Sequence, residues 1–330
     1  MKDLKLLQIV PSLESGGVEQ GTVDVANYIA SKGLDSFIVS SGGKMMHQLD
    51  RKKAHHITLP LYSKNIFTMF RNTNKLKKII EENHINLVHV RSRAPAWILR
   101  YISNNKFKTV STFHNVYGHQ NFIKRYYNKG MCKVDNIVAI SEYVKSSIVD
   151  IYKINDNRIT IIYRGIDTDF FNPEIQNENQ YVEFLYKYNL PNDKKIILYP
   201  GRLTSWKGQI EFLSIVESLD SKNVICYFIG DDKNNSYKNK LTNQIKKRNL
   251  SFCCKILGHL SREDIRFMYK SADIIISAPI KPEGFGRIVS ESLAMKKIVL
   301  SYNYGGAKNQ LLGLDRLFTV NPFDKNEMIE

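Results

Sequence analysis

Several features that define whole classes of protein are absent from this sequence. Its 330 residues include only four cysteines, and none of Cys132, Cys226, Cys253 and Cys254 forms a Cys-x-x-Cys pair, so neither a disulfide framework nor a zinc site is expected. No run of about 18 apolar residues occurs, so no membrane-spanning helix is predicted. The first apolar stretch ends at Pro11 and is too short for a signal peptide. We therefore expect a cytoplasmic protein.

Negative charge is also scarce. The chain has 48 Lys and Arg against 32 Asp and Glu, a formal net charge of +16. This excess favours an anionic partner, which could be nucleic acid, a membrane surface or a phosphorylated substrate. An AT-rich genome, which enriches Lys, Asn and Ile, is the alternative explanation. Because the basic residues are dispersed and no recognition motif is present, nucleic acid is not expected as a partner.

Short apolar runs alternate with helical segments along the whole chain. Seven predicted strands cover residues 6–10, 36–40, 57–59, 87–90, 109–112, 136–139 and 159–162. Six more cover residues 195–200, 224–229, 253–257, 273–277, 298–301 and 317–320. Continuous apolar runs are typical of buried parallel strands. The repeated strand–helix alternation predicts an α/β protein with two Rossmann-like, doubly wound parallel-sheet domains.

A polar, turn-rich segment at 165–180 separates the two series and is predicted as a linker. It divides the chain into an N-terminal domain, 1–164, and a C-terminal domain, 181–330. Residues 1–173 hold 25 Lys or Arg and 14 Asp or Glu, a net charge of +11, whereas residues 174–330 hold 23 and 18, a net charge of +5. Most of the positive charge therefore lies in the first domain.

Two loops that follow predicted strands have features of phosphate sites. The first strand leads into Gly16-Gly17, where a tight turn exposes backbone N–H groups at a helix start. The alternative is a turn that only needs positive φ. The eighth strand leads into Arg202 and Lys207, two cations beside a helix start that suit a diphosphate. Their alternative is a pair of solvated surface cations.

A third loop, Pro-Glu-Gly-Phe-Gly, carries the first of two glutamates. Glu283 lies in the loop and Glu291 about two turns into the following predicted helix. The loop can aim Glu283 at a reacting sugar, while Gly284 and Gly286 allow backbone N–H groups to approach it. Glu291 can accept hydrogen bonds from a ribose diol. The alternative is one glutamate at a helix N-terminus and one solvated glutamate.

Together these motifs resemble the retaining glycosyltransferases of family four. The likeness rests on the order Gly-Gly-Val-Glu, Gly-Arg-Leu-x-x-x-Lys-Gly and Pro-Glu-Gly-Phe-Gly with a second Glu, and it extends from Leu6 to about Gly306. The stretches SLESGGVEQGTV, RSRAPAW and GRLTSWKGQ are similar to bacterial envelope members of the family. The resemblance implies a GT-B fold, in which two Rossmann-like domains face each other across a cleft.

The resemblance also implies residues that bind the donor. Arg202 and Lys207 would hold the diphosphate of a UDP-, GDP- or ADP-linked sugar. Gly17 would approach the phosphates or the acceptor, and Glu291 would take the ribose hydroxyls. His259 would border the nucleotide base. This nucleotide sugar is a co-substrate, and no separate cofactor is expected.

Two residues are expected to act on the reacting sugar. Glu283, with the backbone of Phe285 and Gly286, would contact the transferred sugar. His114 would lie over that sugar, the alternative being an ordinary loop or core histidine. The resemblance implies same-face attack through an oxocarbenium-like state. Glu283 is then either the nucleophile or an electrostatic and hydrogen-bonding partner, and we favour the second role.

No metal is expected in this reaction, because the cations and helix N-termini can stabilise the departing diphosphate. The sequence does contain Asp167-Thr168-Asp169, which matches the Asp-x-Asp motif of metal-dependent transferases. Its position at the start of the predicted linker fits the family's interdomain segment, and we expect no metal there.

The acceptor is expected to be an anionic glycolipid or lipid-linked glycan, such as a lipopolysaccharide core or a lipid-linked oligosaccharide. Residues 65–83, with Phe67 and Phe70, and residues 117–131 interleave aromatic with basic side chains. Such surfaces can lie on anionic lipid, here the inner face of the cytoplasmic membrane. The alternative is a pair of amphipathic helices packed on the sheet.

Family members usually continue for some tens of residues beyond the point where this chain ends. A truncated, non-catalytic homologue that binds nucleotide sugars is therefore the competing interpretation. A phosphorylase-like or sugar-nucleotide hydrolase activity is a further rival.

Overall fold

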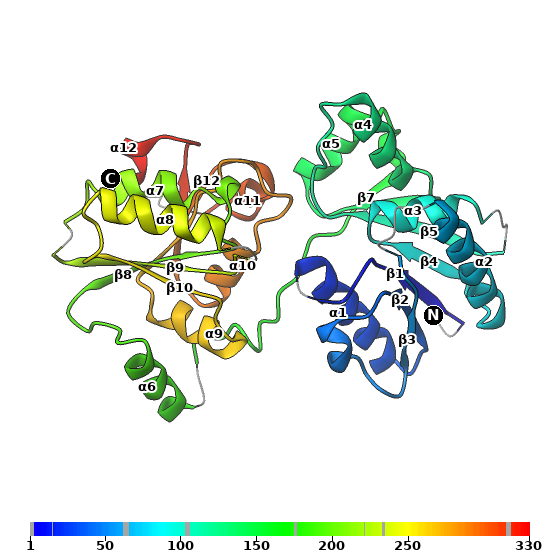
Figure 1. Cartoon of the computed structure of the whole chain (residues 1–330), viewed down its shortest axis with the longest axis horizontal. Coiled ribbons are helices and arrows are strands. Elements are labelled where there is room, and N and C mark those ends of the chain that lie inside the picture. The colour runs from blue at the N-terminus through cyan, green and yellow to red at the C-terminus, as the bar shows by residue number, and fades with distance from the viewer. Residues whose placement is uncertain are drawn as a thin grey trace. The chain divides into compact units, whose positions relative to one another are not determined.

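The chain forms two compact α/β units that meet in sequence between Tyr163 and Arg164 (Figure 1). Residues 165–180, the predicted linker, thus belong to the second unit. The computed structural model describes residues 3–14, 16–61, 66–102, 106–174, 177–220, 222–232, 235–314 and 318–330. The side chains of Phe67 and Phe70 lie outside this described part.

Unit 1 is a seven-stranded parallel sheet in the order β3-β2-β1-β4-β5-β6-β7. Its strands are β1 (Leu6–Ile9), β2 (Ser36–Ser40), β3 (Ala54–Thr58), β4 (Leu87–Val90), β5 (Lys108–Phe113), β6 (Asn136–Ala139) and β7 (Ile159–Ile161). Its α-helices are α1 (Gly17–Ser31), α2 (Ile66–Glu82), α3 (Arg93–Arg100), α4 (Phe122–Lys129) and α5 (Glu142–Tyr152), with short 3-10 helices η1 (Lys44–Gln48), η2 (Gly130–Cys132) and η3 (Asp156–Arg158).

Unit 2 is a six-stranded parallel sheet in the order β10-β9-β8-β11-β12-β13. Its strands are β8 (Lys195–Pro200), β9 (Val224–Ile229), β10 (Cys254–Gly258), β11 (Ile274–Ser277), β12 (Ile298–Tyr302) and β13 (Thr319–Val320). Its helices are α6 (Glu178–Lys187), η4 (Ser205–Lys207), α7 (Gln209–Val216), α8 (Ser236–Lys247), α9 (Arg262–Ser271), α10 (Arg287–Ala294), α11 (Gly305–Gln310) and α12 (Lys325–Ile329).

All thirteen predicted strands are present. Several, such as β8, β9 and β11, are continuous apolar runs that are largely buried in the sheet. The largest error is β3, which begins at Ala54 rather than at residue 57. As an edge strand with the polar pair His55-His56, it lacks the apolar run on which the prediction relied. The predicted start of β13 at residue 317 lies outside the described residues.

The strand order reverses once in each sheet. Unit 1 reverses between β1 and β4, and unit 2 between β8 and β11. At such a switch point the loops after the two strands run in opposite directions, and a crevice opens beyond their carboxyl ends. The predicted loops of Arg202 and Lys207 after β8 and of Glu283 after β11 flank the switch point of unit 2.

Apolar residues from the sheet and its helices form the core of each unit. The four cysteines are buried free thiols. Burial raises the pKa of Cys132 to about 12, which keeps this thiol protonated and unreactive. Within the described part of the chain, no helix has both the length and the apolar character needed to cross a bilayer.

Candidate functional site

The switch point of unit 2 brings together an ion pair between residues far apart in sequence. The Lys207 ammonium lies 2.5 Å from Glu283 Oε1, and the two side chains are only 11% and 13% exposed. Lys207 comes from the loop after β8 and Glu283 from the loop after β11, and these strands are neighbours in the sheet. The strand order therefore places both predicted residues at one point.

The loop that carries Lys207 is clamped onto the end of β11. The buried hydroxyl of Tyr199 donates to the carbonyl of Lys207 at 2.6 Å and to that of Ala278 at 3.0 Å. Gly208 has φ +85°, and a Cβ there would lie 2.4 Å from the Ala278 carbonyl oxygen. Only glycine fits such an approach, so Gly208 fixes Lys207 at the start of α7.

Both predicted diphosphate ligands lie over one indole. The Lys207 ammonium is 5.0 Å and the Arg202 guanidinium 5.9 Å from the centre of the Trp206 ring. Arg202 is exposed, and the Gln209 side chain donates to its carbonyl at 3.1 Å. Sequence reasoning assigned no role to Trp206, although it stands between the two cations in the same motif.

Glu291 lies in α10, within the electrostatic reach of Lys207. Tyr269 donates its hydroxyl to Glu291 Oε2 at 3.0 Å, and Arg287 Nε is 3.3 Å from Oε1. Burial raises the pKa of Glu291, while Arg287, Tyr269 and Lys207 oppose that rise. The sequence could have indicated Arg287 by its i,i+4 spacing. It gave no signal for Tyr269, which comes from α9.

A second glycine pair supports the loop of Glu283. The N–H of Gly306 donates to the Glu283 carbonyl at 2.8 Å, and a Cβ on Gly306 would lie 2.3 Å from the Gly284 carbonyl oxygen. Gln310 donates to the carbonyl of Phe285. The signal for this support was a Gly-Gly pair after β12, the same pattern that singled out Gly16-Gly17 after β1.

Phe285 and Gly286 are the other predicted residues of the loop that carries Glu283. Phe285 is buried, and Gly286 adopts φ +87° as the residue before α10. His259 is exposed beyond the end of β10, which β9 separates from β8. The structure therefore gathers Lys207, Glu283 and Glu291 closely, whereas His259 lies further along the sheet edge.

Gly17 and His114 belong to unit 1. Gly17 is the exposed first residue of α1, and Gly16 before it has φ +129°. The turn that needs positive φ is therefore made by Gly16. A Cβ on Gly43 would lie 2.4 Å from the carbonyl carbon of Leu13, so the loops after β1 and β2 pack tightly.

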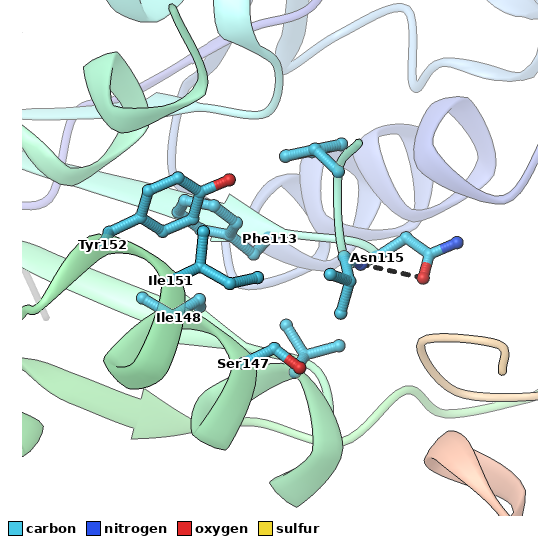
Figure 2. A pocket seen from close by; sticks show the side chains of 9 residues that line it. Phe113, Asn115, Ser147, Ile148, Ile151 and Tyr152 are labelled. Atoms are coloured by element: carbon cyan, nitrogen blue, oxygen red, sulfur yellow. Dashed lines mark hydrogen bonds between the residues drawn. The ribbon is translucent and has the colours of Figure 1, made fainter. Parts of the chain in front are cut away.

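His114 directly follows β5 and is half-buried. Beside it lies a small crevice with about 160 Å³ of empty space, lined by residues of the β5 end and of α5. Figure 2 shows the rings of Phe113 and Tyr152 side by side in it, and Asn115 Oδ1 accepting from the N–H of Val116 at 2.8 Å. This crevice is too small for a nucleotide sugar.

Comparison with known proteins identifies the family. The profile of Glycosyltransferase Family 4 matches residues 15–170, and that of Glycosyl transferases group 1 matches residues 183–328. A solved glycosyltransferase from Rickettsia africae is 34% identical, with a TM-score of 0.87, and the alignment covers 100% of this chain and 87% of that one. The chain belongs to glycosyltransferase family 4.

Two further comparisons concern proteins of lower sequence identity to this family-4 glycosyltransferase. The capsular polysaccharide biosynthesis glycosyltransferase CapM of Staphylococcus aureus is 25% identical over 100% of this chain and 87% of its own length. The solved complex of Anabaena HepE with UDP-glucose has a TM-score of 0.82 at 16% identity and covers 99% of this chain and 88% of that one. These likenesses confirm the predicted GT-B fold of two parallel-sheet α/β domains.

The Asp-x-Asp sequence of this glycosyltransferase has a structural role. Asp167 pairs with Arg262 at 2.8 Å and accepts the N–H of Phe170 at 3.0 Å. The Arg262 guanidinium also lies 4.1 Å from the centre of the Phe170 ring. The carboxylate therefore attaches the chain just after the unit boundary to α9. Among the described residues, no group of three or more His, Cys, Asp or Glu side chains is placed to hold a metal.

Proposed function

We propose that this protein is a retaining glycosyltransferase that moves a sugar from a nucleoside-diphosphate sugar to a glycan or glycolipid of the cell envelope. The contact between Lys207 and Glu283, with Glu291 close by, carries the proposal. It places a cation and two carboxylates at the carboxyl ends of β8 and β11, where α/β proteins bind nucleotides. The fold shared with HepE, which was solved with UDP-glucose, supports a nucleotide-sugar donor.

The chemistry follows from the charges that develop in the reaction. When the bond between the anomeric carbon and the diphosphate oxygen breaks, the electron pair leaves with the diphosphate and the sugar ring becomes positive. Lys207 and Arg202 would stabilise the diphosphate, and the Glu283 carboxylate would stabilise the ring. The acceptor oxygen then bonds to the anomeric carbon from the same face, and its proton leaves with the diphosphate.

In this proposal the donor rearranges the ion pair at the site. The ammonium of Lys207 pairs with Glu283, and it also interacts electrostatically with Glu291. A bound diphosphate adds a second acceptor for that ammonium, with Arg202 and the start of α7 beside it. Glu283 would then be directed to the sugar, while Glu291 accepts the two ribose hydroxyls. His114 would contact the transferred sugar. We propose that these groups act without a metal.

Two observations support the proposed acceptor: the net charge of the first part of the chain and the name of one relative. Residues 1–173 carry a net charge of +11, which favours an anionic acceptor. The name of CapM assigns that relative to capsular polysaccharide biosynthesis. We propose that this chain uses a lipid-linked envelope glycan, such as a lipopolysaccharide core or a lipid-linked oligosaccharide, at the inner face of the cytoplasmic membrane.

A single-turnover assay tests this function. The purified chain is mixed with UDP-, GDP- and ADP-sugars and a lipid-linked acceptor, and the anomeric configuration of the product is read by NMR. We expect transfer with retention from one donor class. Transfer should fall about 100-fold in Lys207→Ala and in Glu291→Ala. Donor binding without transfer or hydrolysis would indicate the non-catalytic homologue instead.

A thermal-shift screen with the same donors tests the site directly. The preferred donor should raise the unfolding temperature of the natural chain, because it binds the folded state only. The shift should be lost in Lys207→Ala. The matched control is Lys195→Ala, which removes an exposed cation paired with Asp273 in the same unit. An undiminished shift in Lys207→Ala would refute the site.

A further inference from the structure

Helix α4 of unit 1 exposes its apolar residues. Phe122 and Ile123 are each 73% exposed and Tyr126 is 54% exposed. Within the described residues of unit 1, no other large apolar side chains are as exposed as Phe122 and Ile123. An amphipathic helix of a globular protein normally turns such residues toward the core. Here the helix packs through Tyr127 and Asn128 instead, and Phe122 and Ile123 are left largely exposed.

Helix α2, the other segment with interleaved aromatic and basic residues, behaves in the opposite way. Its apolar residues Leu76 and Ile80 are buried, as are Asn72 and Thr73 on the same side. For the described part of α2, the alternative of a helix packed on the body of the protein is therefore correct. For α4 the alternative holds for the side that carries Tyr127 and Asn128, but Phe122 and Ile123 remain exposed. The structure thus separates two segments that the sequence could not.

Basic residues surround the exposed apolar residues. Lys124, Arg125 and Lys129 lie on α4 itself. Residues 83–134 contain no Asp or Glu, and they contain nine basic residues: Arg91, Arg93, Arg100, Lys106, Lys108, Lys124, Arg125, Lys129 and Lys133. A stretch of 52 residues without a carboxylate carries an excess of positive charge, and Lys124 and Arg125 of α4 are exposed within it. Its charge complements an extended anionic surface.

The exposed residues are held on a firm support. Trp97 of α3 donates to the Tyr127 carbonyl at 2.8 Å and stacks on the Tyr127 ring at 6.2 Å. Asn121 caps α4 by accepting the N–H of Ile123. The Tyr126 ring lies 5.5 Å from Trp97. Because α4 is fixed in this way, its apolar residues can enter a partner with little loss of conformational entropy.

Helix α4 also lies at a suitable place in the unit. It is the crossover from β5 to β6, and its first turn follows β5 through residues 114–121. Phe122 and Ile123 are in that first turn, so they come soon after the carboxyl end of the strand that precedes His114 (Figure 1). This is the sheet edge at which α/β proteins bind ligands.

We propose that the exposed part of α4, with Phe122, Ile123 and Tyr126 and the cations Lys124, Arg125 and Lys129, is a docking face for an anionic phospholipid bilayer. Phe122 and Ile123 would enter the interface between headgroups and acyl chains, and the three cations would contact lipid phosphates. Exposed aromatic and aliphatic residues within a positive field suit a bilayer, because both the apolar layer and the anionic headgroups are satisfied at once. The inference deepens the proposed function, since a lipid-linked acceptor would lie in that bilayer.

Co-sedimentation of the full chain with vesicles tests the docking face. Vesicles of phosphatidylglycerol and phosphatidylcholine should bind the chain, and pure phosphatidylcholine should bind it at least about tenfold more weakly. The double variant Phe122→Ser/Ile123→Ser should also lose about tenfold in binding to the mixed vesicles. The matched control is Val182→Ser/Tyr186→Ser on α6, where Tyr186 is 83% exposed beside Glu183. Equal losses in both double variants would overturn the proposal.

Charge and insertion are measured separately. Lys124→Glu/Arg125→Glu should abolish the preference for phosphatidylglycerol, and added salt should weaken binding of the natural chain. In a Trp206→Phe background, Trp97 is the only tryptophan, and its emission should shift to the blue when mixed vesicles are added, because Tyr126 beside it enters the lipid. An unchanged preference after charge reversal, or an emission that does not shift, would contradict docking through α4.

Failure of the proposed function would look different. Donor-induced thermal shifts should be the same in Phe122→Ser/Ile123→Ser as in the natural chain, because α4 contains none of the proposed donor-binding residues. Vesicle binding through α4 without any sugar transfer would refute the proposed function and leave the docking face intact. Transfer to a lipid-linked acceptor that is undiminished in this variant, together with undiminished vesicle binding, would refute the docking face alone.

Discussion

The charged residues of the two units are arranged in contrasting ways. At the switch point of unit 2, Lys207 is paired with Glu283 and Arg287 with Glu291. The side chains of Lys207, Glu283 and Glu291 are largely buried, and that of Arg287 is partly exposed. Unit 1 has nine cations and no carboxylate in residues 83–134, and apolar residues of α4 are exposed among them. A balanced, enclosed cluster suits a small ligand of fixed shape, whereas an unbalanced open face suits a broad anionic surface. Each prediction below perturbs one side of this contrast.

The largest effect is expected from Lys207→Met. Removing the cation leaves the Glu283 carboxylate in a poorly solvated place without its partner, which should cost about 3 kcal/mol of folding free energy. Donor binding should also fall by about 100-fold, because the diphosphate loses its main cation. Urea denaturation and titration with the nucleoside diphosphate measure the two effects.

A double variant separates stability from binding. Lys207→Met/Glu283→Gln removes both charges and should recover most of the lost stability, because no unpaired charge remains. It should not recover donor binding. If the double variant is as unstable as Lys207→Met alone, the unpaired charge of Glu283 is not the cause of the lost folding free energy.

A smaller loss of stability is expected from Gly306→Ala. The added methyl group would lie 2.3 Å from the Gly284 carbonyl oxygen, so the loop of Glu283 must move. We expect a cost of about 2 kcal/mol, measured by urea denaturation. Gly165→Ala is the matched control, since a Cβ there meets nothing within 4 Å, and its effect should stay within about 0.5 kcal/mol. Similar losses in both variants would show that the tight contact is unimportant.

The sequence predicted those features of the fold and the candidate site that are encoded within one short stretch of the chain. It did not predict contacts between segments that are distant in sequence. Buried strands are apolar runs, and Lys207, Glu283 and Glu291 stand in recognisable motifs, so all of these were predicted. Tyr269 was not, because its partner lies on another helix and the two meet only through the packing of α9 and α10. For α4, periodicity indicates that a helix has an apolar face but not whether the fold covers it.

Tyr269→Phe tests the unpredicted contact between Tyr269 and Glu291. Its expected effect is smaller than that of Gly306→Ala. The buried Tyr269 hydroxyl fixes Glu291 Oε2, so its loss should let the carboxylate turn away from the ribose. We expect donor affinity to fall about fivefold, which corresponds to roughly 1 kcal/mol for a single hydrogen bond. The deciding measurement compares a ribonucleotide with its 2′-deoxy form. The natural chain should prefer the ribonucleotide more strongly than the variant does, whereas an equal preference would reduce Tyr269 to a packing role.

The smallest effect is a difference in how the two units respond to pH. In unit 1, burial lowers the pKa of His56 below its ordinary value of 6.5. Unfolded chains therefore bind the proton first as the pH falls, and unit 1 should lose stability below about pH 6.5. In unit 2, burial raises the pKa of Glu291 above its ordinary value of 4.5, so the folded state binds the proton first and unit 2 should gain stability as the pH falls toward that value.

The two tryptophans allow this difference to be measured. Trp97 lies in unit 1 and Trp206 in unit 2, so Trp206→Phe and Trp97→Phe each leave one fluorescent reporter. Urea denaturation followed between about pH 7 and pH 5 should show unit 1 becoming less stable and unit 2 more stable. Burial raises the pKa values of Asp264 and Asp273 in unit 2, but their hydrogen bonds and ion pairs together outweigh burial and lower both pKa values below 3.8. The stability that these two carboxylates contribute is therefore lost only as the pH falls through that value. His56→Gln should weaken the pH dependence of the stability of unit 1 and leave that of unit 2 unchanged. If both reporters show the same change of stability with pH, the buried charged carboxylate of Glu291 does not destabilise unit 2.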